Sequence, residues 1–174
     1  LGDVYKRQAQ ESTEKMQTPV CYCKNMSVDA ILHYYASQLE QKGIKYRYSV
    51  EVPEKMKISD LDICRIFGNL MENAVRAVQK EENADETYVN CICKVKMGKL
   101  LINIENTYAG EVQRNGAAFY STSHSGQGIG IASVSKTAEK YGGYADFSAR
   151  NGIFRANVFI PLEDMDLRLS DKAD

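Results

Sequence analysis

The sequence predicts one α/β domain in which helices alternate with strands that are joined mainly by hairpins. Three observations lead to this fold class: an apolar stripe at helical spacing runs through residues 58–80, apolar and polar residues alternate in three other stretches, and turn-forming dipeptides divide two of those stretches. A length of 174 residues with 44% hydrophobic residues allows one substantial core and leaves little room for a second full domain.

The predicted helix over residues 58–80 is the element around which the chain is organised. Ser59 or Asp60 is its expected N-cap. The apolar stripe that faces the core consists of Ile63, Ile66, Phe67, Leu70, Met71, Ala74, Val75 and Val78. Asn69, Asn73 and Arg76 lie on one strip beside this stripe. Because asparagine is a mediocre helix former, the amide pair indicates either a task outside the helix or plain solvated surface amides.

The other elements are, in chain order, a helix, a strand, a hairpin, a helix led in by glycines, and a second hairpin. They are predicted over residues 27–43, 44–53, 87–106, 126–143 and 144–161. Ser27 is the expected cap of the first of these helices. The first hairpin is expected to turn at Met97-Gly98 or Gly98-Lys99, and the second at Asn151-Gly152.

Composition narrows the functional classes. The formal charge is -1 and the pI is near 6.2, which gives no general attraction to nucleic acid or to an acidic membrane. No run approaches the roughly 18 apolar residues of a membrane span, and no signal-peptide pattern opens the chain, so the segment is expected in the cytoplasm. The five cysteines include two CxC pairs without the CxxC spacing of zinc sites, which favours reduced structural thiols over metal ligands.

Three glycines mark a candidate binding site for a charged oxygen. Gly126, Gly128 and Gly130 end a long loop rich in Gly, Ser and Thr and lead directly into a predicted helix. Such a helix start can cradle a phosphate, although the same glycines would also suit a flexible hinge. The Lys of a P-loop is missing, and no strand directly precedes the triplet as a dinucleotide-binding fold requires.

Three ordered segments then identify a family resemblance. NLMENAVRA at residues 69–77, IENTYAG at 104–110 and GQGIGI at 126–131 resemble the N, G1 and G2 boxes of the GHKL ATPases, the superfamily that includes DNA gyrase and the sensor histidine kinases. The subgroup it resembles most is the quorum-sensing type of histidine kinase, which typically has Asn in place of Asp in G1. The resemblance covers about residues 25–162.

This resemblance implies a Bergerat fold, an α/β two-layer sandwich whose mixed, mainly antiparallel sheet carries helices packed on one face. The element order predicted from periodicity agrees with that fold. We accordingly expect a linker or the end of an upstream helical segment at residues 1–24, the ATP-binding domain at 25–162, and a loose tail at 163–174.

The resemblance also implies a site for ATP and Mg²⁺. It places Mg²⁺ on Asn73, and it places Asn69 where the ATPase branches have a glutamate that activates water. Because an amide is no base at neutral pH, slow hydrolysis and preferred transfer are expected. Arg76 matches a phosphate-contacting position, with a solvated arginine as the plain alternative, and Asn106 replaces the aspartate that accepts from adenine. The remaining expected ATP contacts are Gly110, Thr122, Ser123, Gly126, Gly128, Ile129, Gly130 and Ile131.

The implied function is the ATP-binding domain of a two-component sensor histidine kinase. Its implied partners are an upstream dimerisation domain with the phosphoacceptor histidine, and a response regulator; the parent protein is expected to be a membrane-anchored homodimer. His33 lies among tyrosines without an acidic neighbour, and neither it nor His124 has the HD or HE context of a phosphoacceptor. A non-catalytic nucleotide-sensing module and a serine kinase related to anti-sigma factors remain the alternatives.

Overall fold

The computed structural model describes residues 20–81, 86–109, 114–115, 118–119 and 129–162 of the chain. Three helices are present in these ranges: α2 (Met26–Gln41), α3 (Asp60–Val78) and α4 (Ile129–Lys140). The main strands are β1 (Lys45–Val50), β2 (Tyr88–Lys96), β3 (Lys99–Thr107), β6 (Tyr144–Arg150) and β7 (Ile153–Pro161). The predicted order of helix, strand, helix, hairpin, helix and hairpin is confirmed.

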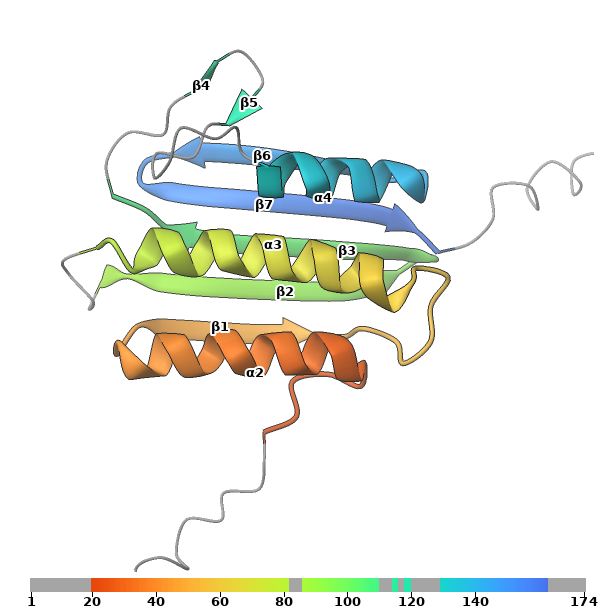
Figure 1. Cartoon of the computed structure of the whole chain (residues 1–174), viewed down its shortest axis with the longest axis horizontal. Coiled ribbons are helices and arrows are strands. Elements are labelled where there is room, and N and C mark those ends of the chain that lie inside the picture. Colours follow the sequence, from red (N-terminus) through yellow and green to blue (C-terminus); the bar gives the residue numbers. More distant parts are fainter. Residues whose placement is uncertain (1–19, 82–85, 110–113, 116–117, 120–128, 163–174) are drawn as a thin grey trace, which may run out of the picture.

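The five main strands form one sheet in the order β1-β2-β3-β7-β6. β1 runs parallel to β2, whereas the β2–β3, β3–β7 and β6–β7 pairs are antiparallel. The three helices cover the same face of this sheet, with α3 between α2 and α4 (Figure 1). The mixed, mainly antiparallel two-layer sandwich expected from the sequence is therefore confirmed.

Each hairpin turns at two residues with left-handed backbone, a Met-Gly pair in the first hairpin and an Asn-Gly pair in the second. Met97 and Gly98 have φ values of 51° and 68°, and Asn151 and Gly152 have φ values of 51° and 73°. Two successive residues with positive φ form the turn that matches the twist of paired strands. The first turn thus uses Met97-Gly98 rather than Gly98-Lys99, and the second lies where it was predicted.

The organising helix α3 buries the face that its sequence predicts. All eight residues of the apolar stripe are buried in the core between the helices and the sheet. Ser59 is the N-cap, since its Oγ accepts a hydrogen bond from Asp62 N at 3.2 Å. Burial of this stripe is the main force that holds α3 on the sheet.

The start of α2 differs from the prediction. Its N-cap is Asn25 and not Ser27, because the extended backbone at Asn25 lets Oδ1 accept a hydrogen bond from Val28 N at 3.0 Å. Asn25 is itself buried. Just ahead of it, Tyr22 N and Cys23 N donate to Asp29 Oδ1 at 2.7 and 3.1 Å. The segment that leads into α2 is therefore bonded to the first turn of that helix.

The loop predicted after β3 contains two short strands, β4 (Arg114–Asn115) and β5 (Ala118–Phe119), which pair antiparallel.

The five cysteines are free thiols, and Cys91 and Cys93 are buried in the core as the strand alternation predicts. Within the described ranges, no helix has both the length and the apolar character needed to cross a membrane.

Candidate functional site

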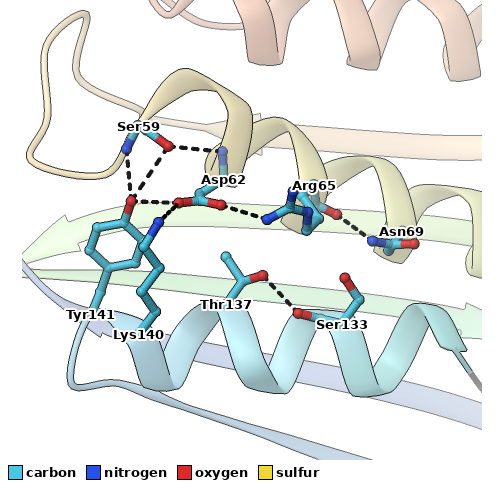
Figure 2. Close-up of polar contacts among 8 residues, drawn as sticks. All are labelled: Ser59, Asp62, Arg65, Asn69, Ser133, Thr137, Lys140 and Tyr141. Carbon is cyan, nitrogen blue, oxygen red and sulfur yellow. Dashed lines mark hydrogen bonds and ion pairs between the residues drawn. The ribbon is translucent and has the colours of Figure 1, made fainter.

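Three elements that carry the predicted motifs meet at one end of the molecule. The C-terminal half of α3, the last residues of β3 and the first turn of α4 lie toward the left in Figure 1. α3 and α4 lie side by side and run in opposite directions, so the start of α4 faces the second half of α3 (Figures 1 and 2). The fold therefore gathers the described parts of the three motifs, residues 69–77, 104–109 and 129–131, which lie far apart in the sequence.

Asn69 and Gly130 form the contact between two of these motifs. The half-buried Asn69 donates Nδ2 to Arg65 O, one turn earlier in α3, at 2.8 Å. A Cβ atom added to Gly130 would lie 3.1 Å from Asn69 Oδ1, which is tighter than an ordinary van der Waals contact. The amide of Asn69 is thus held in one orientation, and α4 approaches it closely because Gly130 has no side chain.

Asn73 and Arg76 lie further along α3 and are exposed. Asn73 makes no side-chain hydrogen bond to the part of the chain that the structure describes. The Arg76 guanidinium forms an ion pair with Glu72, and both side chains are about half exposed. Neither Asn73 nor Arg76 supports the core, so both are available to a ligand at this end of α3.

Asn106 is the buried polar residue of the site. It lies near the end of β3 on the face that packs against the helices, and only 1% of it is exposed. Its Nδ2 donates to Thr107 O at 2.7 Å, whereas its Oδ1 has no hydrogen-bond partner in the described part of the chain. A buried acceptor without a partner is costly, so this oxygen is suited to a donor supplied by a ligand.

The remaining predicted contacts are only partly placed. Ile131 is half-buried and packs against the core, and Ile129 is the first residue of α4. Five further residues lie outside the described ranges: Gly110, Thr122, Ser123, Gly126 and Gly128.

Sequence reasoning missed a polar cluster at the other end of α3 and α4, centred on Asp62 (Figure 2). The Asp62 side chain is 3% exposed and bonds to Arg65, Lys140 and Tyr141. Hydrogen bonds from Lys140 and then Tyr141 lower the pKa of this carboxyl from 3.8 to about 2. The sequence indicated Ser59 or Asp60 as the N-cap of this helix, but no sequence pattern connected Asp62 with residues at the end of α4.

The description of His33 also needs a correction. It does have an acidic neighbour, since its Nε2 lies 3.5 Å from Asp29 Oδ2, one helical turn away. Its ring also packs on Tyr22, with 4.7 Å between the ring centroids. His33 therefore lies in the middle of α2 and packs against the segment that precedes this helix.

The fold defined by these elements is that of histidine kinase catalytic domains. A nucleotide-free form of the catalytic domain of histidine kinase ThkA is similar, with a TM-score of 0.58, 14% identity, and coverage of 79% of this chain and 92% of that domain. The histidine kinase AdeS of Acinetobacter baumannii is similar with a TM-score of 0.56 and 14% identity, over 79% of this chain and 64% of that one. Among curated protein sequences, no relative matches.

A family model places the chain more specifically. The model described as GHKL domain matches residues 58–161, which span α3 through β7 and include Asn69, Asn73, Asn106 and Gly130. This protein therefore belongs to the GHKL domain family.

Proposed function

We propose that this chain is the ATP-binding catalytic domain of a two-component sensor histidine kinase. In this role it presents the γ-phosphate of Mg-ATP to a histidine on an upstream dimerisation domain. Membership of the GHKL family and the fold of histidine kinase catalytic domains support the proposal.

The Oδ1 of Asn106, which has no hydrogen-bond partner among the described residues, is the observation that carries the nucleotide assignment. Because Nδ2 is committed to Thr107 O, the amide presents Oδ1 as a fixed acceptor inside a buried position. The exocyclic amino group of adenine is a donor and satisfies this oxygen, whereas guanine has a carbonyl oxygen at the corresponding position and would repel it. The residue therefore favours adenine even though it lacks the charge of an aspartate.

The exposed residues on α3 suit the phosphate end of the nucleotide. The amide oxygen of Asn73 is a hard ligand of the kind that Mg²⁺ accepts, and it is free of other hydrogen bonds within the described residues. When bound, Mg²⁺ would neutralise charge on the phosphates. Arg76 can exchange its exposed Glu72 partner for a phosphate oxygen, because surface ion pairs are weak. The first turn of α4 adds backbone N–H groups at the positive end of a helix.

Asn69 supports the proposed preference for transfer over hydrolysis. An amide is no base at neutral pH, and the bond of Nδ2 to Arg65 O and the close approach of Oδ1 to Gly130 hold this amide in place. Its proposed catalytic role is to shape the site beside the phosphates, without acting as a base.

The test is titration of Mg-ATP into the full chain by calorimetry, with Asn73→Ala as the variant and Asn157→Ala as the control. Asn157 is an exposed amide on the opposite face of the sheet, paired with Asn103. We expect binding to the parent and the control, and at least a tenfold weaker affinity for Asn73→Ala without loss of thermal stability. Absence of binding to the parent, or equal binding by all three proteins, contradicts the proposal.

The proposed partners are tested by supplying them. We propose that a dimerisation domain with the phosphoacceptor histidine precedes this domain, that a response regulator receives the phosphoryl group, and that the parent protein is a membrane-anchored homodimer. Labelled ATP should give acid-labile phosphohistidine when that upstream domain is restored. Binding of ATP without phosphohistidine would favour a nucleotide-sensing module, and acid-stable label on a serine acceptor would favour a serine kinase.

A further inference from the structure

The Asp62 cluster lies at the end of the α3–α4 pair opposite to the Asn69–Gly130 contact (Figure 2). One carboxylate oxygen of Asp62 accepts from Arg65 Nη1 at 2.7 Å within α3. The other oxygen accepts from Lys140 Nζ at 2.6 Å and from the Tyr141 hydroxyl at 2.7 Å. A buried carboxylate thus receives two donors from the last residue of α4 and the residue that follows it.

Tyr141 extends this link to the cap of α3. Its hydroxyl oxygen accepts a hydrogen bond from Ser59 N at 3.1 Å while its proton is donated to Asp62. In a capping box, an acidic side chain within the same helix would accept from the N-cap N–H. Here a residue next to α4 fills that position, so the end of α4 is bonded to both the cap and the first turn of α3.

In the middle of the helix pair, no comparable hydrogen bond between α3 and α4 is present among the described residues. Thr137 is buried there, but its hydroxyl donates to Ser133 O in its own helix at 2.7 Å (Figure 2). Val134 and Ala138 are buried apolar residues, and apolar burial is favourable without being directional. Among the described residues, the hydrogen bonds that join the end of α4 to α3 are therefore those to Asp62 and Ser59.

We propose that Asp62 is a positioning residue for the nucleotide site: by fixing α4 along α3, it holds Gly130 against Asn69. A helix is stiff along its axis, so a shift at Lys140 and Tyr141 is transmitted to the first turn. The contact at Gly130 tolerates little movement, because the space for even one methyl group is lacking. The link to ATP binding rests on the proposed function, whereas the link to α4 position does not.

The experiment compares Asp62→Asn with the parent in two measurements on the full chain. The first is the backbone amide chemical shift of Gly130 by ¹⁵N NMR without nucleotide, and the second is the Mg-ATP dissociation constant by calorimetry. We expect the Gly130 resonance to move and the dissociation constant to rise at least fivefold. Tyr141→Phe, which keeps the ring and removes only the hydroxyl, should move the same resonance in the same direction and serves if Asp62→Asn does not fold.

Leu32→Ala is the control, because Leu32 is buried on α2 and its loss lowers stability without touching α4. It should leave both the Gly130 shift and the affinity of the folded protein unchanged. The inference is overturned if the Gly130 resonance stays in place in Asp62→Asn and Tyr141→Phe, or if Leu32→Ala moves it equally. If the parent does not bind Mg-ATP, the proposed function fails, while the NMR measurement still decides whether Asp62 positions α4.

Discussion

The amide oxygen of Asn69 on α3 lies so close to Gly130 on α4 that a Cβ atom at Gly130 would stand 3.1 Å away from it. This contact joins a helix-face amide to the glycine that ends the glycine-rich segment, two features that sequence analysis assigned to one site. The fold therefore places them together through the antiparallel arrangement of α3 and α4 (Figure 1).

Gly130→Ala should separate binding from stability. Alanine is favoured over glycine in a helix by about 0.5–1 kcal/mol, which offsets the cost of displacing Asn69 by a few tenths of an ångström. We expect little change in the free energy of unfolding, and an Mg-ATP affinity that is lower by roughly three- to tenfold because Asn69 and the start of α4 move apart. Urea unfolding and calorimetric titration provide the two measurements.

Gly68→Ala is the matched control for this substitution. Gly68 is also in a helix, but a Cβ atom there meets nothing within 4 Å. It should be neutral or stabilising and should bind Mg-ATP like the parent. Equal affinities for Gly130→Ala and the parent would show that the contact with Asn69 has no role in binding.

Asn106→Leu should remove base selectivity while keeping the fold. Leucine is similar in size, so the substitution loses the bond to Thr107 O but also removes the unpartnered oxygen, and the free energy of unfolding should change by less than about 1.5 kcal/mol. Loss of a buried hydrogen bond to adenine, worth about 1–2 kcal/mol, should weaken ATP binding roughly 5- to 30-fold. Calorimetry with ATP and GTP measures this directly.

The comparison of nucleotides decides the prediction for Asn106. GTP should bind the parent much more weakly than ATP, and the difference should nearly disappear in Asn106→Leu. An ATP preference that survives unchanged in the variant would mean that another residue reads the base.

The elements that sequence reasoning placed correctly are those in which one local period dominates. The stripe on α3 and the two positive-φ turns are specified by residues within one element, and the structure confirms them. The N-cap of α2 was predicted wrongly as Ser27. Asn25 and Ser27 are both good N-cap residues, and only the position of Asn25 in the folded chain decides between them.

The parts of the site that were not predictable depend on contacts between elements. Asn106 was assigned through a family resemblance, but its burial and its unpartnered oxygen follow from the packing of β3 under the helices. Asp62 carried no signal beyond its place as an acidic residue near the start of the helix, because its donors Lys140 and Tyr141 lie 78 and 79 residues further along the chain. Periodicity reports which face of an element is buried, and it does not report which polar groups meet across two elements.

The buried Asp62 carboxylate should make stability depend on pH in acid. Its pKa in the folded protein, lowered to about 2 by Lys140 and Tyr141, is below the value of 3.8 expected when the chain is unfolded. The carboxylate therefore contributes its full stabilisation above about pH 4–5, and this contribution is lost as the pH falls toward 2.

Asp62→Asn should lower the free energy of unfolding by about 1–3 kcal/mol at pH 7, as expected for lost charge-assisted hydrogen bonds. This difference in the free energy of unfolding between the variant and the parent should shrink between about pH 4 and pH 2.5. Urea unfolding at several pH values measures the difference, with Asp60→Asn as the control because Asp60 is an exposed carboxylate in the same turn. A gap between parent and Asp62→Asn that stays constant down to pH 2.5 would contradict the assigned role of the carboxylate charge.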